Sequence, residues 1–384
     1  IYDLIDHPFV QRLRRIRQLG LSSLVYPGAT HSRFHHALGS MHLCNLSITN
    51  LREKGIEISD HEHEAVMCAA LLHDIGHGPF SHSLEKELIN VHHEDLTLRI
   101  MQELNVLFNG ALDLTISVFT KKYERPFLSQ LISSQLDVDR MDYLNRDSFY
   151  TGVAEGNINA ERLITMLNVV NNELVVEEKG IYSIEKFLMA RRFMYWQVYL
   201  HKTGLVAEQL LIRILKRARQ LVVKGLLLDC SEPLLFFMEN KIGKPHFNTA
   251  TLDKFAQLDD TDILAAIKKW QHHDDFVLSK LCQMIINRKL LTIKMKNKPI
   301  ASAKFEAEFE AFKNVHGLSD EETGFFVFEG EVTNRAYDLE KQKINILKKD
   351  GKLRDVAKAS DHLNLRTLSK MVTKYYICHP KESV

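Results

Sequence analysis

Cysteine is scarce in this chain of 384 residues: there are five, and no two are spaced as a CxxC pair. Neither a disulfide framework nor a thiolate zinc site is indicated, and a reducing cytoplasmic setting fits. Glycine and proline are also few, at 17 and 8 residues, which disfavours turn-rich sandwiches and barrels and favours long helices. We therefore expect a mainly α fold.

The chain also lacks a net charge of either sign and long apolar runs. Lys plus Arg number 50 and Asp plus Glu 49, so no global field gathers nucleic acid or an anionic membrane. No apolar run reaches the roughly 18 residues of a membrane span, and residues 1–8 lack the basic and apolar zones of a signal peptide. We expect a cytoplasmic protein with neither nucleic acid nor membrane as its main partner.

Hydrophobic spacing predicts helices over most of the first 300 residues. The three-residue spacing of Leu13, Ile16 and Leu19 predicts a basic amphipathic helix over 11–19. Pro27-Gly28 breaks the pattern, and a helix that carries the first histidines follows it. Further helices are predicted over 63–77, 96–150 and 185–224, and a β-hairpin over 173–184 that turns at Lys179-Gly180.

Strand patterns gather at the end of the chain. FFVFEG (325–330), INILKKDGKL (344–353) and VTKYYICHP (372–380) are rich in aromatic and β-branched residues, and Asp350-Gly351 predicts a turn within the second. We expect two parts, a helical core with a helical extension over 1–302 and a small α+β lobe over 303–384.

Histidine is concentrated in one window. Eleven of the 19 histidines fall between His31 and His93. Histidine is the commonest metal ligand, and its unperturbed pKa lies near neutrality, so the cluster indicates a metal site, acid–base chemistry or both. Surface or capping positions are the simpler interpretation for His42, His61 and His63.

The adjacent pair His73-Asp74 can offer two donors to one ion. Because it follows an apolar helix, its burial would cost free energy unless a partner satisfied it. His36 and Asp139, on other predicted helices, complete a set of four ligands that leaves positions open for water and substrate oxygens. Imidazole and carboxylate donors suit one divalent ion, and the sequence does not choose among Mn, Fe, Zn, Ni and Mg.

Four stretches carry a family resemblance: GATHSRFHHALGSMHL, AALLHDIGHGPFSHSLE, HHED and DVDRMDYLNRD. They resemble the HD-domain phosphohydrolases, most closely the deoxynucleoside triphosphate (dNTP) triphosphohydrolases, the dGTPase-like group. The match covers roughly residues 1–300. It implies a helical HD-domain core that cleaves a dNTP to the deoxynucleoside and inorganic triphosphate. It also implies one metal on the four ligands above, with room for a second Mg beside the triphosphate.

The resemblance implies catalytic roles close to the metal. His82 is the expected proton donor to the departing 5′-oxygen, because a histidine in an anion-rich pocket can be protonated near neutrality. His77 and His93 are nearby candidates for the same task. Glu94 or Glu85 would orient an imidazole.

The resemblance also implies a binding site for the substrate. Arg33, Arg140 and Arg191 would contact the triphosphate, where charge-assisted contacts stabilise both the ligand and the developing charge. Tyr143 would pack under the deoxyribose, and Asp147 would bond the 3′-hydroxyl. The other expected contacts are Gln18, Leu19 and Tyr195, the last standing where a human member of this group has a histidine.

Regulation and assembly are further expectations from the resemblance. A homodimer or homotetramer is expected, and a nucleotide activator at a subunit junction is a hypothesis. Two alternatives stay open: another HD-type nucleotide phosphohydrolase (a nucleotidase or phosphodiesterase), or a non-catalytic nucleotide sensor. The residues that match activator contacts are Asp6, Gln11, Arg14, Arg162 and Arg288.

Overall fold

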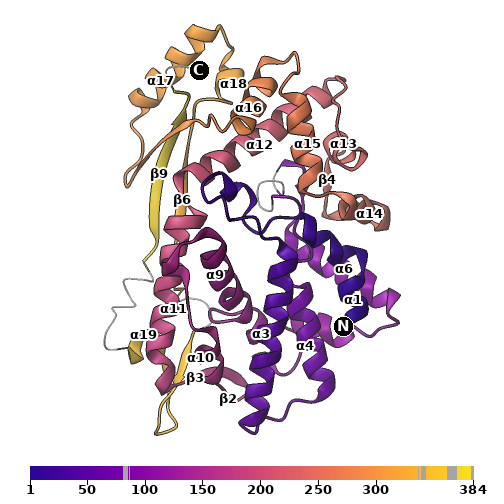
Figure 1. Cartoon of the computed structure of the whole chain (residues 1–384), viewed down its shortest axis with the longest axis vertical. Coiled ribbons are helices and arrows are strands. Elements are labelled where there is room, and N and C mark those ends of the chain that lie inside the picture. The colour runs from indigo at the N-terminus through magenta and orange to yellow at the C-terminus, as the bar shows by residue number, and fades with distance from the viewer. Residues whose placement is uncertain (81–84, 86, 336, 339–342, 361–369, 382–384) are drawn as a thin grey trace.

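Helices form most of the molecule, which confirms the mainly α expectation (Figure 1). The computed structural model describes residues 1–80, 85, 87–335, 337–338, 343–360 and 370–381. The helices of the first half are α1 (Tyr2–Asp6), α2 (Pro8–Gln11), α3 (Arg33–Glu53), α4 (Asp60–Leu72), α6 (His93–Leu107), α7 (Asp113–Phe119), α8 (Pro126–Ile132), α9 (Val138–Thr151), α10 (Ala160–Thr165) and α11 (Ile181–Met194). The later helices are α12 (Lys202–Val223), α13 (Glu232–Glu239), α14 (Thr249–Gln257), α15 (Asp260–Trp270), α16 (Phe276–Ile286), α17 (Ser302–His316), α18 (Asp320–Thr323) and α19 (Val356–Ala359).

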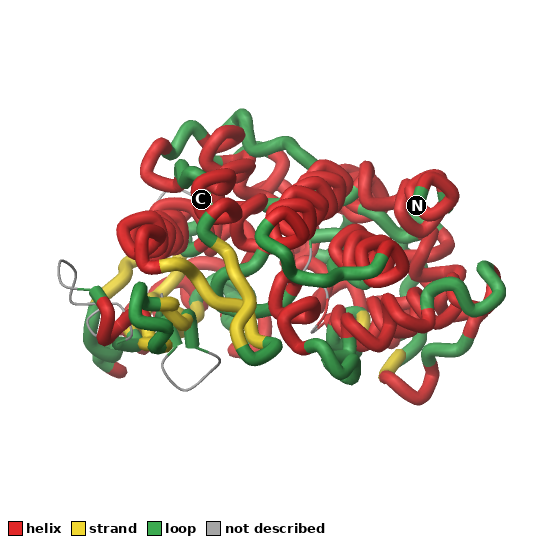
Figure 2. Tube along the Cα trace, turned by 90° about the horizontal axis from the view of Figure 1, so that it is seen from below, coloured by secondary structure: helices red, strands yellow, loops and turns green. Residues whose placement is uncertain are grey.

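The strands form small sheets, most of which gather on one side of the molecule (Figure 2). One sheet has the order β2-β3-β7-β8 and another the order β5-β9-β6, while β1 and β4 make a two-residue parallel pair. The turn at Asp350-Gly351 joins β7 to β8 as expected. The strands are β1 (Ile89–Asn90), β2 (Leu167–Val170), β3 (Glu173–Glu177), β4 (Ile242–Gly243), β5 (Thr292–Lys296), β6 (Phe328–Asn334), β7 (Asn345–Leu347), β8 (Leu353–Asp355) and β9 (Val372–His379).

Two local predictions were wrong. The hairpin lies earlier than predicted: β2 and β3 turn at Asn171 and Asn172, both with positive φ, and the segment after β3 starts α11 instead of a second strand. Asparagine tolerates this left-handed conformation, so the Asn pair makes the turn. The predicted helix over 11–19 is also broken. Residues Arg12–Arg15 form a short 3₁₀ helix, and Arg17 makes a β-bridge with Ser32.

Caps define the helices that carry the site. α4 starts with a capping box, in which Ser59 Oγ accepts from the backbone of Glu62 and Glu62 accepts from the backbone of Ser59. Asp137 caps the start of α9, because its carboxylate accepts from the Arg140 backbone at 2.8 Å. Gly152, with φ 74°, caps the end of the helix. These caps define where α4 and α9 begin. His73 lies at the end of α4, and Asp139 lies in the first turn of α9.

Two apolar clusters support the site from opposite sides. One includes Leu71, Leu72 and Ile75 with residues of α6 and α12–α16, and the other includes Ala69 and Ala70 with residues of α3 and α8–α11. The end of α4 therefore lies between two cores, which fixes the following residues rigidly. Both clusters contain residues from before and after position 302, so strand pairing and packing join the two predicted parts. The boundary at 302/303 stays a prediction.

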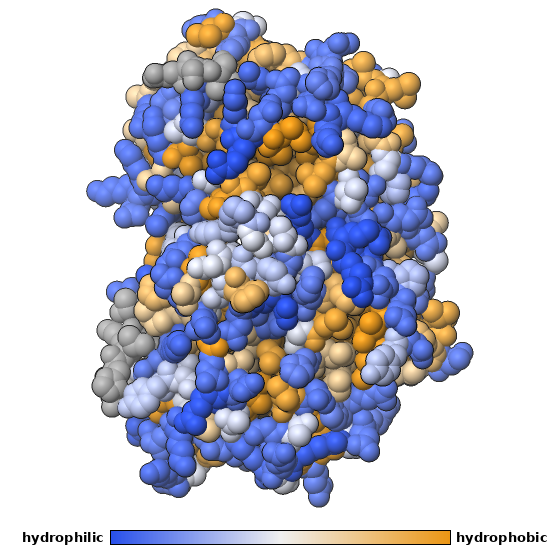
Figure 3. Space-filling model, in the orientation of Figure 1, coloured by the Kyte–Doolittle hydropathy of each residue, from blue (hydrophilic) through white to orange (hydrophobic). Residues whose placement is uncertain are grey.

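Hydrophilic residues cover most of the face seen in Figure 3, and the apolar side chains form separate patches. Within the described residues, none of the helices has the length and apolar character needed to cross a bilayer.

Candidate metal centre and catalytic site

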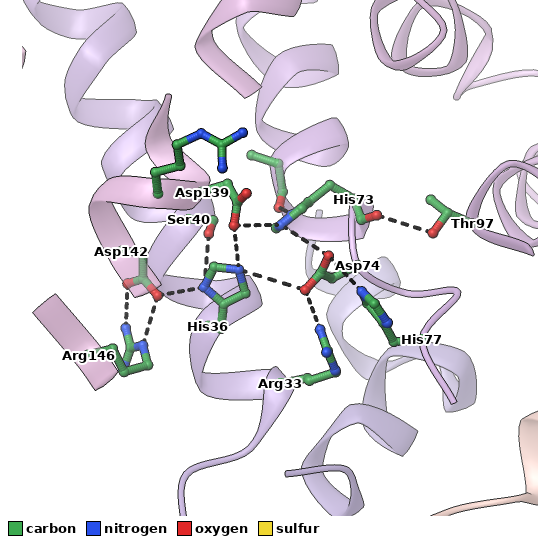
Figure 4. Close-up of polar contacts among 12 residues, drawn as sticks. Arg33, His36, Ser40, His73, Asp74, His77, Thr97, Asp139, Asp142 and Arg146 are labelled. Carbon is green, nitrogen blue, oxygen red and sulfur yellow. Dashed lines mark hydrogen bonds and ion pairs between the residues drawn. The ribbon is translucent and has the colours of Figure 1, made fainter. Parts of the chain in front are cut away.

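Four side chains from three helical segments meet at one point. Oδ1 of Asp139, in the first turn of α9, lies 3.0 Å from Nε2 of His36 on α3 and 3.4 Å from Nε2 of His73 after α4. Asp74 is beside them: its Oδ1 lies 3.5 Å from Nε2 of His73, and its Oδ2 lies 3.8 Å from Nε2 of His36. Figure 4 shows the four side chains pointing toward one another. The structure thus brings together the predicted ligand set.

The Nδ1 atoms of His36 and His73 already make hydrogen bonds within the protein. Nδ1 of His73 donates to the carbonyl oxygen of Ala70 at 2.7 Å, and Nδ1 of His36 donates to Oδ2 of Asp142 at 2.8 Å. A neutral ring held in this way presents the lone pair of Nε2 to the site. Both Nε2 atoms are buried, and neither has a partner in hydrogen-bonding geometry among the described residues. Two such atoms beside two carboxylates fit a divalent metal ion.

The electrostatics of the cluster favour positive charge between its members. Burial would lower the pKa of His36, but Asp139 and Asp142 raise it to about 10. Burial would raise the pKa of Asp139, but His36 and His73 hold it well below its usual range. The cluster therefore binds a proton tightly, and a divalent ion would displace that proton when it binds.

Asp74 is held from its far side by Arg33. Nη1 of Arg33 lies 2.5 Å from Oδ2 of Asp74, and Nε2 of His77 lies 3.5 Å from Oδ1. Burial would raise the pKa of Asp74, but His73, His77 and Arg33 keep it well below its usual range. An ionised Asp74 is thus fixed between the imidazoles and a guanidinium at the edge of the cluster.

A second imidazole group adjoins Asp74. The rings of His77 and His93 stack with centroids 4.0 Å apart and planes at 16°. Oε1 of Glu85 lies 2.9 Å from Nδ1 of His93 and 3.5 Å from Nδ1 of His77, so Glu85 contacts both rings. Glu94 is exposed on α6, with a carboxylate oxygen within 4.8 Å of a ring nitrogen of His93. His82 lies outside the described residues.

Aromatic rings connect the metal cluster to Asp147. The ring centroid of Tyr143 lies 6.4 Å from that of His36 and 6.0 Å from that of Tyr199. The Tyr199 hydroxyl donates to Oδ2 of Asp147 at 2.8 Å. The spacing along α9 predicts that Asp139, Tyr143 and Asp147 share one side of the helix, and these contacts agree with it.

Predicted triphosphate contacts surround the same tyrosine. Burial raises the pKa of the Tyr143 phenol, and the positive charges of Arg140 and Arg191 oppose that rise. Arg140 follows Asp139 in the first turn of α9. Tyr195 packs edge-on against Tyr199 with centroids 5.2 Å apart, and the Arg191 guanidinium carbon lies 5.9 Å from the Tyr195 ring. Cations and aromatic rings therefore lie together beside the metal cluster.

The structure brings only some of the predicted activator residues together. Arg14 donates to Oε1 of Gln11 at 2.7 Å and lies 3.7 Å from the Phe34 ring centroid. Arg288 donates to the carbonyl oxygen of Leu24 at 2.8 Å. Asp6 ends α1, and Arg162 lies on α10. The binding of an activator by these residues stays a prediction.

Asp142 and Arg146 support His36 from behind, a role that was not predicted from the sequence. Arg146 binds Asp142 with two hydrogen bonds, Nε to Oδ2 at 2.8 Å and Nη2 to Oδ1 at 2.7 Å, so Asp142 joins Arg146 to His36 (Figure 4). Both residues are on α9 at four-residue spacing, which is a weak signal for an ion pair in the sequence. Gly39 makes the approach possible, because a Cβ there would lie 1.9 Å from Oδ1 of Asp142.

A second unpredicted support is the fully buried Arg12. Its guanidinium donates to the carbonyl oxygens of His77 at 2.8 Å, Leu258 at 3.2 Å and Ile75 at 3.3 Å, and lies 4.3 Å from the Phe255 ring centroid. Burial lowers the pKa of Arg12 to about 9. Arg12 is therefore buried although it lies in the first basic segment, because its side chain holds the turn after His73-Asp74.

Two features together define the class of this protein: a helical bundle, and a His, His-Asp, Asp cluster contributed by α3, the end of α4 and the start of α9. Family profiles match this region. The HD domain matches residues 33–147, and the HD associated region matches residues 158–225.

Known proteins resemble the chain, some over nearly its whole length and others over about half of it. The YwfO protein of Bacillus subtilis is 34% identical over 100% of this chain and 89% of its own. A crystal structure of a phosphohydrolase from Bacteroides thetaiotaomicron is 48% identical, with a TM-score of 0.95 over 99% of this chain and 95% of that one. The deoxynucleoside triphosphate triphosphohydrolase SAMHD1 homolog of Dictyostelium discoideum is 32% identical over 53% of this chain and 43% of its own length. The chain belongs to the HD-domain, dNTPase-like family of phosphohydrolases that includes these SAMHD1 relatives.

Proposed function

We propose that this protein hydrolyses deoxynucleoside triphosphates to the deoxynucleoside and inorganic triphosphate. The observation that carries the proposal is that cations lie on the cluster and beside its neighbouring tyrosine: Arg33 contacts Asp74, and Arg140 and Arg191 act on Tyr143, whose ring lies near His36. Three cations complement the negative charge of a triphosphate tail, and an aromatic ring can pack against a sugar or base face. The names of the SAMHD1 relatives support the same substrate class.

His36, His73, Asp74 and Asp139 would hold the divalent ion. When bound, such an ion polarises a phosphate oxygen and lowers the pKa of a coordinated water. The Arg33 guanidinium contacts Asp74 at the edge of the cluster, so it can bind a phosphate oxygen there. Arg140 and Arg191 would bind the rest of the tail and thereby fix the α-phosphorus against the cluster.

The imidazole group of His77 and His93 would supply the proton that the departing 5′-oxygen requires, together with His82. Glu85 holds both stacked rings through their Nδ1 atoms, so it can orient them and stabilise a protonated imidazole. The His77 ring contacts Asp74, so the stacked pair lies next to the atoms that would bind the α-phosphate.

The direct test is the identity of the products. We would incubate the purified protein with each of the four dNTPs and with GTP, singly and mixed, with Mn²⁺ or Mg²⁺, and separate the products by anion exchange. Deoxynucleoside plus triphosphate is expected, and activity only in mixtures would support a nucleotide activator. Monophosphate or stepwise phosphate release would favour another HD-type hydrolase, and no product in any mixture would favour a nucleotide sensor.

A control variant tests the assignment of the metal. Asp139→Ala removes the carboxylate shared by His36 and His73, so bound metal and turnover are both expected to disappear. A metal-replete and fully active Asp139→Ala protein would remove Asp139 from the site.

A further inference from the structure

His31 connects two segments on which the sugar end of the proposed site depends. Its carbonyl oxygen accepts from the backbone N–H of Gln18 at 3.0 Å, and its Nε2 donates to Oδ1 of Asp147 at 2.7 Å. Its side chain is fully buried, and its ring stacks on Tyr150 with centroids 4.4 Å apart. One residue thus ties the segment before α3 to α9, with both bonds in the protein interior.

The Asp147 carboxylate is held from both sides. His31 donates to Oδ1 and the Tyr199 hydroxyl to Oδ2, so the plane of the carboxylate is fixed. A carboxylate has about four lone-pair sites, and these two bonds leave acceptor capacity for a ligand. The Tyr143 ring packs against Tyr199, so a ligand on that ring lies next to the fixed carboxylate.

Gln18 offers an independent sign of a polar ligand at this end. Its Oε1 is buried and has no hydrogen-bond partner among the described residues. An unsatisfied buried oxygen costs free energy, and a ligand hydroxyl that donates to it would remove the cost. The His31 carbonyl accepts from the Gln18 backbone, so the segment that carries this oxygen is joined to the residue that holds Asp147.

We propose that His31 is a positioning residue that holds the Asp147 carboxylate for the 3′-hydroxyl of the nucleotide and so sets the preference for substrates that carry this group. The inference rests on the proposed function, because it takes the bound sugar to be a deoxyribose. A 2′,3′-dideoxynucleotide offers no donor there, so the Asp147 carboxylate would stay without a ligand partner. Rejection of a ligand that leaves buried polar groups unpaired is a strong form of specificity.

The test compares variants that remove or keep the His31 donor. His31→Leu keeps apolar bulk but cannot donate to Asp147, whereas His31→Gln keeps an N–H donor. His42→Leu, at an exposed position on α3, is the matched control. For each protein we would measure kcat/KM for the four dNTPs and for their 2′,3′-dideoxy forms. His31→Leu is expected to lose about 10- to 100-fold on the dNTPs and little on the dideoxy forms, as for loss of a bond to a charged group.

The ratio of the two substrates separates positioning from general damage. His31→Gln is expected to restore part of the preference, and His31→Leu placed on Asp147→Asn should change the ratio no further. Equal losses on dNTPs and dideoxy forms would overturn the proposal. So would a wild-type protein with no preference between them.

Binding of the free nucleosides keeps the inference separate from turnover. We would titrate each deoxynucleoside and its 2′,3′-dideoxy form into wild type and His31→Leu by calorimetry. A wild type that hydrolyses no dNTP but prefers the 3′-hydroxyl, with the preference lost in His31→Leu, would refute the proposed function and sustain the inference. A wild type that binds both nucleoside forms equally, or neither, would refute the inference whatever its turnover.

Discussion

Asp142 accepts a hydrogen bond from Nδ1 of His36 at 2.8 Å. Since the carboxylate can only accept, this bond fixes the tautomer of the neutral ring and aims Nε2 at Asp139. Arg146 in turn holds Asp142 through two bonds. The metal centre is therefore oriented by residues that would not touch the metal, and their contribution can be measured.

Asp142→Asn should weaken metal binding about 10- to 100-fold, the usual effect of losing the partner behind a metal-binding histidine. The amide lacks the charge that supports His36 and breaks the paired contact with Arg146. Metal content after dialysis against graded chelator measures the effect. Asp253→Asn, an exposed position on α14, is the control. Unchanged retention of metal would show that Asp142 does not support the site.

Gly39→Ala should separate α3 from α9. The new Cβ would lie 1.9 Å from Oδ1 of Asp142 and 2.2 Å from Nη2 of Arg146, so the helices must shift or the ion pair must break. We expect a loss of about 1–3 kcal/mol in the free energy of unfolding, together with lower metal content. Urea unfolding and metal analysis measure both.

Gly204→Ala is the matched control for that substitution. Gly204 also lies in a helix, but its nearest neighbour in space would be Ser22 Oγ at 4.0 Å from the new Cβ. Alanine there should raise stability by about 0.5–1 kcal/mol, because glycine loses more backbone entropy on folding. A Gly39→Ala protein that behaves like Gly204→Ala would refute close contact between α3 and Asp142.

Glu62 should make stability depend on pH in acid. Burial would raise its pKa, but bonds from the Ser59 backbone, Arg125, the Ser59 hydroxyl and Tyr123 lower it below 4.5. A depressed folded pKa means that the stabilisation is present above about pH 4.5 and is lost as the pH falls through the folded pKa. Glu62→Gln should cost about 1–2 kcal/mol at pH 7 and progressively less in stronger acid.

Urea unfolding between pH 7 and pH 3 measures this difference. Glu64→Gln is the control, since Glu64 is 62% exposed on the same helix. A Glu62→Gln deficit that stays constant down to pH 3 would show that ionised Glu62 does not contribute through these bonds.

His82→Ala should keep bound metal and substrate affinity but lower kcat by roughly 10² to 10⁴, the usual contribution of a positioned acid. The expectation rests on the resemblance of HDIGHGPFSH to the family, because His82 lies outside the described residues. Single-turnover rates and metal analysis would separate chemistry from binding. An unchanged kcat would assign the proton to the stacked pair of His77 and His93 instead.

The sequence by itself determined the class of fold and singled out four candidate metal ligands that the structure brings together. Few Gly and Pro residues and the helical spacing predicted a mainly α protein, and the order His36, His73-Asp74, Asp139 predicted a set that the structure brings within 3.8 Å. The turn at Asp350-Gly351 was also predictable. Such signals are local, because a turn needs particular residues and an apolar stripe needs a fixed period.

Only the tertiary structure decided what supports those ligands. The bonds of His31 to Asp147, of Asp142 to His36 and of Arg12 to His77 join residues 116, 106 and 65 positions apart. No period or spacing encodes such pairs, since they arise when whole helices pack and each buried polar group must find a partner. The same reason explains the two wrong predictions. The hairpin turn and the helix over 11–19 were predicted from local pattern, while the left-handed turn at Asn171 and Asn172 and the packing of the first basic segment determined where the chain bends.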